Sequence, residues 1–460
     1  MDNKTITTDD LQRMRNNVLL DKNFRIVSNA VQNNGVFDSA FNTQESFKLQ
    51  PIFNVEVKDM SSVTNQKKSG RCWMFAGLNI LREIVKKNLH VKDIELSESY
   101  LMFYDKLEKT NTTLEYIIKH INEPIDSRVL RYDLLLSGDN DGGFWHYFVK
   151  LVKKYGICPK EAMGETDVSS RSCEMNILIN TVVTKYISLI RKNSKDLQVV
   201  YDLKENALQE VYKILAICIG LPVDEFTFDF EFEDDKKNKN EDKKKDEDEE
   251  KKVIKTIKTT PLEFSKTYLS CNLDDYVILT NYPSLQYPFY QTYTNKGCVN
   301  MMEETSKNAY KSLNVPINLI KEVAIKSLKD NTPLWFACDV TSEMYREEGY
   351  LATEVSDVSE IFGIDFKYDK MERALLLNSE CNHAMTLTGV HLDSNNTPIR
   401  WKVQNSWGED VGKKGIFIMS DEWFSEYVYE CIVDKKYLND DIIEAYSKEP
   451  IVLEPWSIVC

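Results

Sequence analysis

The spacing of apolar side chains divides the chain into two unlike halves. From Cys72 to Val85 apolar residues occupy nearly every side of a helical wheel, a pattern that predicts a helix buried within the protein. Residues 96–109 predict a second helix with Ser97 as its N-cap. The stretch FWHYFVKLVKKYG predicts a third, which Gly156 ends. The N-terminal half is therefore predicted to be helical.

The pattern changes after about residue 380, where short β-rich runs begin. They read HAMTLTGVHL, IRWKVQNSW, GIFIMSD and YVYECIVD, and turn-forming Asn, Asp and Gly residues separate them. A helical half followed by a β half predicts an α+β protein with a cleft where the two halves meet.

Two segments depart from this pattern. Residues 1–50 show little periodicity, which predicts an arm that wraps or hooks rather than an independent domain. Residues 233–252, EDDKKNKNEDKKKDEDEEKK, carry ten acidic and eight basic side chains and nothing apolar to bury. This composition predicts a disordered surface insertion, with a docking tail for a partner as the alternative.

Composition and charge narrow the class of protein. With 460 residues the chain exceeds the usual single domain, so two or three structural units are expected. Its net charge of −15 makes binding to nucleic acid or an anionic membrane unlikely. The N-terminus lacks an apolar signal segment, and the longest apolar run, residues 214–223, is too short to span a bilayer, so we expect a cytoplasmic protein. None of the ten cysteines forms a C-x-x-C pair, which favours reduced thiols.

One cysteine has unusual neighbours, in the stretch NQKKSGRCWMFAG. Cys72 falls in the first turn of the predicted buried helix, where unpaired backbone N–H groups and the helix dipole stabilise a thiolate. Ser69 and Gly70 leave room there for a substrate carbonyl. Cys72 is therefore the candidate nucleophile. An inert buried thiol, the alternative, suits the other nine cysteines better.

A cysteine nucleophile needs a base, and the chain has five histidines. His383 opens a predicted strand directly after a turn, where its side chain can project over a cleft. Asn405, in VQNSWG, suits the acceptor that orients an imidazole, and Trp407 could shield their hydrogen bond or simply pack in the core. The side-chain amide of Gln66 and the backbone N–H of Cys72 could stabilise an oxyanion. The remaining histidines are interpreted as surface or packing residues: His90, His120, His146 and His391.

Together, NQKKSGRCW, HAM and NSWGE in this order resemble the papain-like cysteine peptidases, in which the glutamine also precedes the cysteine by six positions. The separation of Cys72 from His383 far exceeds the roughly 130–150 residues of simple papains, so a large insertion must lie between the halves. Longer stretches, including DGGFWHYFVKLVKKYGICPK and KVQNSWGEDVGKKGIFIMSDEWFSEYVYE, resemble the bleomycin hydrolase or aminopeptidase C group. This resemblance runs from about residue 5 to 456.

The resemblance implies a papain-like two-lobed core with additions. The implied units are an N-terminal hook (1–50), a helical lobe (51–160), a helical insertion used in assembly (161–330), a β lobe (331–447) and a C-terminal tail directed at the active site (448–460).

By the same resemblance the chain is a cytosolic thiol aminopeptidase that forms a homohexameric ring and needs no cofactor or metal. Its substrates would be peptides with a free N-terminus, and also the bleomycin carboxamide and homocysteine thiolactone. Cys72, His383 and Asn405 would be catalytic and Gln66 the oxyanion donor. The pair Gly142 and Gly143 would line the substrate backbone, or form only a helix-start turn.

The tail EPWSIVC ends four residues after Trp456, a shorter tail than the family pattern. We expect the carboxylate of Cys460 to pair with the substrate's free amine. If the tail does not reach the cleft, the enzyme would accept blocked or longer peptides, as an endopeptidase does. Two further alternatives are a nucleic-acid-binding scaffold with a basic channel and a transglutaminase-like acyl transfer.

Overall fold

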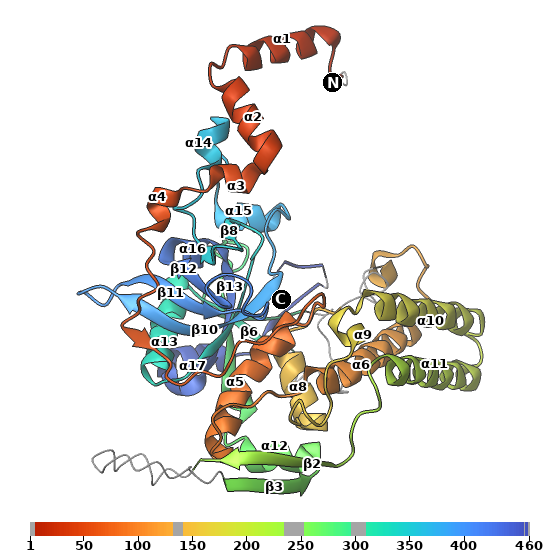
Figure 1. Ribbon diagram of the computed structural model, residues 1–460. Helices are drawn as coiled ribbons and strands as arrows, with labels where there is room; N and C mark the ends of the chain where they lie inside the picture. Colours follow the sequence, from red (N-terminus) through yellow and green to blue (C-terminus); the bar gives the residue numbers. More distant parts are fainter. Residues whose placement is uncertain (1–4, 132–140, 234–252, 296–309, 455, 459–460) are drawn as a thin grey trace, which may run out of the picture.

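The computed structural model describes residues 5–131, 141–233, 253–295, 310–454 and 456–458. All but the first residue of the predicted charged insertion, and also Cys460, lie outside these ranges. A bundle of helices lies on one side of the molecule and a long mixed sheet on the other, with α5 (Cys72–Leu89) beside the sheet (Figure 1). No helix within the described ranges is both long and apolar enough to cross a membrane.

The helical half is built around α5, which is buried on nearly every side, as the sequence predicts. Gly77 allows this packing, because a Cβ there would lie 2.8 Å from the Phe148 ring. The other helices of this half are α6 (Glu98–Lys119), α8 (Trp145–Tyr155), α9 (Asp167–Ser170), α10 (Cys173–Lys192), α11 (Leu197–Cys218) and α12 (Pro261–Tyr268).

Two predicted helix boundaries are confirmed, and a third differs. Ser97 caps α6 by accepting a hydrogen bond from the Tyr100 backbone N–H at 3.0 Å. Gly156, with φ of 80°, ends α8. The α6 helix continues past Lys109 because later residues such as Leu114 are also fully buried in the helical core.

The sheet follows the order β14-β5-β6-β4-β13-β7-β10-β11-β12-β9-β8, with β1 paired to β10. Its strands are β1 (Val55–Glu56), β4 (Tyr276–Thr280), β5 (Gln291–Asn295), β6 (Ser312–Asn314), β7 (Leu334–Cys338), β8 (Met344–Tyr345), β9 (Tyr350–Leu351), β10 (His383–Leu392), β11 (Pro398–Gln404), β12 (Ile416–Ser420), β13 (Val428–Asp434) and β14 (Ile451–Leu453). The four β-rich runs predicted after residue 380 correspond to β10, β11, β12 and β13.

The sheet extends further back along the chain than the sequence predicts. Strands β4, β5 and β6 fall within residues 161–330, expected to be a helical insertion, yet β4 pairs antiparallel with β13 in the main sheet. The run YVILT in β4 is short and largely apolar, and such a run does not distinguish a buried strand from a helix segment.

The remaining helices belong to the β half of the chain. They are α13 (Ile317–Lys329), α14 (Val358–Phe362), α15 (Lys370–Leu375), α16 (Asp421–Tyr427) and α17 (Asp440–Ser447). A separate antiparallel hairpin, β2 (Phe226–Phe232) with β3 (Val253–Thr259), flanks the charged segment in the sequence.

The N-terminal residues form helices despite their weak periodicity. They are α1 (Thr8–Leu19), α2 (Phe24–Asn34), α3 (Val36–Ala40) and α4 (Thr43–Ser46). Thr7 and Asp10 form a reciprocal capping box at the start of α1, which is a local signal that periodicity does not register. Neither α1 nor α2 contains a buried residue, and both extend away from the rest of the molecule (Figure 1).

Candidate active site

The candidate nucleophile lies where the two halves meet. Cys72 is the first residue of α5 and is half-buried, and the backbone N–H groups of Ala384, in β10, and Trp73 favour its thiolate. The indole N–H of Trp335, in β7, donates to the Trp73 carbonyl at 3.1 Å. These contacts join the start of the buried helix to the middle of the sheet.

Burial is the main influence on the pKa of this thiol. It raises the pKa of Cys72, and the N–H groups of Ala384 and Trp73 offset only part of that effect. The helix-start N–H groups of Cys72 and Trp73 favour the thiolate, but they do not outweigh the hydration that burial removes. A partner that takes up the proton nearby is required.

His383 opens β10 and is held by Asn405. The imidazole Nε2 lies 2.9 Å from Asn405 Oδ1, and both residues are buried. Asn405 Oδ1 also accepts from the Ser406 backbone N–H at 2.8 Å, which fixes the orientation of the amide. Because Oδ1 is an acceptor, Nε2 carries the hydrogen, and Nδ1 keeps the lone pair that can accept a proton. Burial lowers the pKa of His383 to about 4, and the bond to Asn405 opposes this.

Trp407 lies against the imidazole. The two ring centroids are 4.9 Å apart, and the planes are tilted by 32°. The guanidinium of Arg346 lies 5.0 Å from the Trp407 ring centroid, and Phe417 packs edge-on against the indole. Trp407 thus contacts both the imidazole and the core. These contacts are compatible with shielding of the His383–Asn405 hydrogen bond and with simple core packing.

A proton moved from Cys72 to His383 would leave a thiolate and an imidazolium. Burial disfavours each ion alone, by raising the pKa of Cys72 and lowering that of His383. Two opposite charges attract each other more strongly where little water surrounds them. The backbone N–H groups near the sulfur favour the thiolate, and the Asn405 carbonyl favours the imidazolium.

Gln66 is buried in the loop before α5. Its Nε2 donates to the Ser69 carbonyl at 2.7 Å, and its Oε1 accepts from the Ser406 hydroxyl at 2.6 Å. The Gln66 backbone N–H also donates to the Ser406 carbonyl at 2.8 Å. A primary amide carries two N–H groups, so Gln66 can serve Ser69 with one and an oxyanion with the other.

Packing accounts for one of the two glycines predicted to line the substrate. A Cβ at Gly143 would lie 2.5 Å from the Trp73 ring, and the Trp73 indole donates to the Asp141 carbonyl at 2.8 Å. The carbonyl of Gly142 accepts from Lys109 Nζ. The position of the Trp73 indole therefore leaves no room for a side chain at residue 143.

Asp141 was not predicted from the sequence to support the site. Its carboxylate accepts from the Gly70 backbone N–H at 3.0 Å and from Asn176 Nδ2 at 2.7 Å, and it forms an ion pair with buried Lys106. Burial alone would raise the pKa of Asp141, yet Lys106 and the hydrogen-bond donors hold it well below its usual range. The carboxylate thereby anchors the loop that leads into Cys72.

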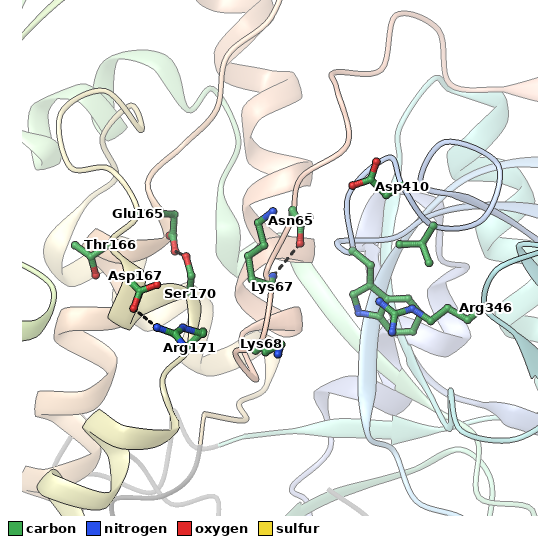
Figure 2. A pocket seen from close by; sticks show the side chains of 12 residues that line it. Asn65, Lys67, Lys68, Glu165, Thr166, Asp167, Ser170, Arg171, Arg346 and Asp410 are labelled. Atoms are coloured by element: carbon green, nitrogen blue, oxygen red, sulfur yellow. Dashed lines mark hydrogen bonds and ion pairs between the residues drawn. The ribbon is translucent and has the colours of Figure 1, made fainter.

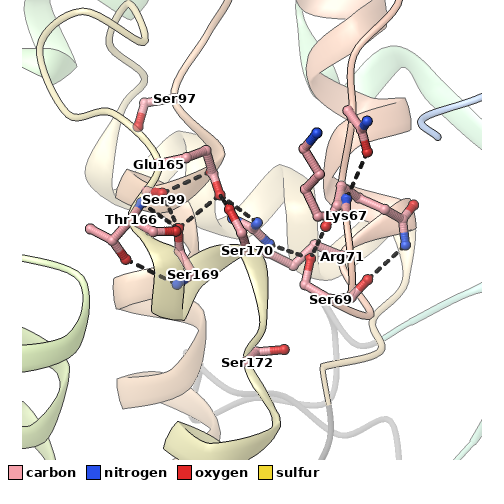
Figure 3. A network of polar contacts seen from close by, with 12 residues as sticks. Lys67, Ser69, Arg71, Ser97, Ser99, Glu165, Thr166, Ser169, Ser170 and Ser172 are labelled. Carbon is pink, nitrogen blue, oxygen red and sulfur yellow. Dashed lines mark hydrogen bonds and ion pairs between the residues drawn. The ribbon is translucent and has the colours of Figure 1, made fainter. Parts of the chain in front are cut away.

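A second buried ion pair supports the same loop (Figure 3). Arg71, next to the candidate nucleophile, forms a bidentate pair with Glu165 at 2.9 and 2.7 Å. Arg71 Nε also donates to the Ser69 hydroxyl at 2.9 Å, and that hydroxyl donates to the Gln66 carbonyl at 2.7 Å. Ser99 Oγ donates to Glu165 at 2.8 Å. A chain of polar contacts thus runs from Glu165 to the residue proposed as oxyanion donor.

These supporting residues could not have been found from local patterns. Arg71 and Glu165 are 94 positions apart, and Lys106 and Asp141 are 35 apart. The only sequence signal is an arginine and a serine in the conspicuous SGRC motif, and neither identifies its acidic partner.

The predicted tail contact is not described, since Cys460 lies outside the described residues. Before it, β14 pairs in parallel with β5, and the guanidinium of Arg128 lies 4.0 Å from the Trp456 ring centroid.

A pocket of about 690 Å³ opens beside Trp407 and is also bordered by Lys67, Lys68, Arg171 and Arg346 (Figure 2).

Comparisons with known proteins identify the family of the chain. Residues 5–459 match the model of the Peptidase C1-like family. The chain is 38% identical over 427 residues to "Aminopeptidase C" of Listeria innocua, covering 93% of this chain and 92% of that protein. It is 34% identical over 459 residues to "Aminopeptidase C" of Lactobacillus delbrueckii subsp. lactis, covering 98% and 97%.

The fold agrees as well. The crystal structure of PepW from Lactobacillus rhamnosis matches with a TM-score of 0.89 at 36% identity, over 99% of this chain and 98% of that one. The chain therefore belongs to the Peptidase C1-like family, with a mixed α/β papain-like fold. Within that family it is a cysteine-type aminopeptidase of the aminopeptidase C group.

Proposed function

We propose that this chain removes N-terminal residues from peptides through an acyl-enzyme formed on Cys72, with His383 as base and acid, Asn405 as the orienting group and Gln66 as oxyanion donor. The observation that carries the proposal is the buried 2.9 Å contact of His383 with Asn405, at the start of the strand whose Ala384 N–H favours the Cys72 thiolate.

Acylation begins when His383 Nδ1 takes the proton from Cys72, and the sulfur attacks the carbonyl carbon of the scissile amide. The Cys72 backbone N–H and the Gln66 amide stabilise the oxyanion. The C–N bond then breaks, and His383 gives the proton to the leaving amine. In deacylation, water gives a proton to His383 and its oxygen attacks the thioester. The C–S bond breaks, and Cys72 regains its proton.

The same chemistry extends to other acyl groups. A primary carboxamide such as that of bleomycin loses ammonia in the acylation step, and homocysteine thiolactone opens by attack on its activated carbonyl. We include both as substrates, on the resemblance to the bleomycin hydrolase group. No cofactor takes part in these steps.

We propose that the substrate's free amine pairs with the carboxylate of Cys460 and that the polypeptide lies along Gly142. We also propose a cytoplasmic homohexamer. The exposed apolar residues of α1, among them Leu11 and Val18, support assembly, because a helix without buried residues leaves such a face to be covered by another copy.

The experiment that tests this function compares a leucyl fluorogenic amide with its N-acetylated twin. Hydrolysis of the free amine at least tenfold faster, and its loss in Cys72→Ser, are the expected results. Equal rates on the two substrates would exclude the exopeptidase assignment, and full activity of Cys72→Ser would exclude the nucleophile.

A further inference from the structure

The pocket beside Trp407 carries three cations without an acidic partner. Its volume of about 690 Å³ falls within the roughly 300–1,000 Å³ of small-molecule sites. Lys67 and Lys68 lie between Arg171 on one side of the pocket and Arg346 on the other (Figure 2). Within the described ranges none of these three forms an ion pair, and all are exposed. Each keeps its full charge for a ligand.

The other charges of the pocket are largely balanced. Arg171 is paired with Asp167, and Glu165 with buried Arg71. Asp410 is the one remaining carboxylate in the lining. The pocket is therefore a locally positive site in a chain with a net charge of −15.

The position of the pocket follows from the proposed proton transfers. His383 must deliver a proton to the leaving amine, so the departing peptide passes the imidazole. Trp407 lies 4.9 Å from that imidazole, centroid to centroid, and the same indole borders the pocket. The pocket therefore lies on the side where the leaving segment emerges.

Resting on the proposed peptidase function, we infer that this pocket binds a carboxylate of the leaving peptide. That carboxylate is either an acidic side chain close to the scissile bond or the C-terminus of a short peptide. Because the cations are exposed, each contact should change KM by a factor of about two to five. High salt should weaken the effect, since it screens such charges over about 3 Å at 1 M.

Three tripeptides separate the two sources of carboxylate. Leu-Gln-Ala amide has none, Leu-Glu-Ala amide has a side-chain carboxylate, and Leu-Gln-Ala acid has the C-terminal one. Release of leucine gives kcat and KM for each. The leucyl fluorogenic amide, which has no peptide beyond the scissile bond, tests the peptidase function itself in the wild-type protein.

The variants are Lys68→Gln with Arg346→Gln, and Arg346→Lys, which keeps the charge but not the planar group. Lys67 is left intact because it adjoins Gln66. The control is Lys195→Gln, in the exposed connection between α10 and α11. The 20 residues of α10 put it about 30 Å from the pocket end of that helix.

At least one acidic peptide should have a KM two- to tenfold lower than the neutral one in the wild-type protein. The double variant should lose this preference, and Arg346→Lys and Lys195→Gln should keep it. A preference for only one acidic peptide identifies the carboxylate source. Equal KM values for all three tripeptides, or a preference that survives in the double variant, would overturn the inference. Absence of leucine release from every substrate would instead refute the proposed function.

Discussion

At the scale of single residues, the orientation of one imidazole decides the proposed chemistry. Asn405 Oδ1 accepts from His383 Nε2 and from the Ser406 N–H, so Nδ1 keeps the lone pair that takes the proton in the proposed reaction. A neutral amide does this without adding a charge that would compete with the thiolate for the imidazolium.

Replacing Asn405 by Ala should shift the alkaline limb of the kcat/KM profile to lower pH. The bond to Asn405 favours protonated His383, so its loss lowers the pKa at which the imidazolium gives up its proton. The expected shift is about one pH unit, from the 1.5–3 kcal/mol of a hydrogen bond to a charged group. Asn395→Ala, in an exposed turn, is the control, and an unchanged alkaline limb in Asn405→Ala would contradict the assigned role.

Gly143→Ala should lower the free energy of unfolding by about 1–3 kcal/mol, because the new methyl group would overlap the Trp73 ring. Gly164→Ala is a matched control, since its nearest neighbour would be a carbonyl 3.7 Å away. Denaturant unfolding of the two variants measures the difference. Equal stabilities would mean that the indole moves aside at no cost.

At the scale of elements, two buried ion pairs fix the loop that joins residue 65 to α5. Arg71 is paired with Glu165 near α9, and Asp141, just before α8, is paired with Lys106 in α6. Removing one partner of a buried pair leaves an uncompensated charge, whereas an exposed pair contributes little.

Glu165→Gln should therefore lower the free energy of unfolding by about 3 kcal/mol, while Asp167→Asn should change it by less than about 0.5 kcal/mol. Asp167 is the control because its pair with Arg171 is exposed, at 76% and 61% of the two side chains. Thermal and denaturant unfolding measure both. A similar small effect in the two variants would show that the buried pair does not hold the loop.

The stability of the helical half should depend on pH through Glu98, the first residue of α6. Glu98 is buried, and burial raises its pKa to about 7, mainly through lost hydration. The pKa of Glu98 is higher in the folded than in the unfolded state. Its contribution to the free energy of unfolding is therefore complete below about pH 4.5 and is lost as the pH rises through 7. Wild-type protein should lose roughly 3 kcal/mol relative to Glu98→Gln between pH 4.5 and 8. Parallel stability curves for the two proteins would contradict this.

At the scale of the whole molecule, the sequence predicted the family and the class of enzyme better than the architecture. The motifs around Cys72, His383 and Asn405 resemble a known family, and few residue types can perform the roles proposed for these three. Strand β4 was missed because a short, largely apolar run has no period of its own, and β5 and β6, which read QTYTN and SLN, are short and mostly polar. The partners Glu165 and Lys106 were missed because only the tertiary fold brings them to the loop.

The proposed chemistry requires the helical and β halves to meet. The proposed nucleophile begins a helix of one half, and the proposed base opens a strand of the other, more than 300 positions later. Any change that separates α5 from β10 should abolish activity without altering either residue.

Site-specific labelling with a thiol-directed epoxide, read by peptide mass mapping, tests the central claim most directly. Cys173 and Cys381 are exposed, whereas Cys72 is only partly accessible, so accessibility alone favours the first two. Activation by His383 predicts that one equivalent of epoxide labels Cys72 first, and that His383→Ala loses this selectivity. Labelling that follows exposure, or that is equal in His383→Ala and the wild-type protein, would contradict the account.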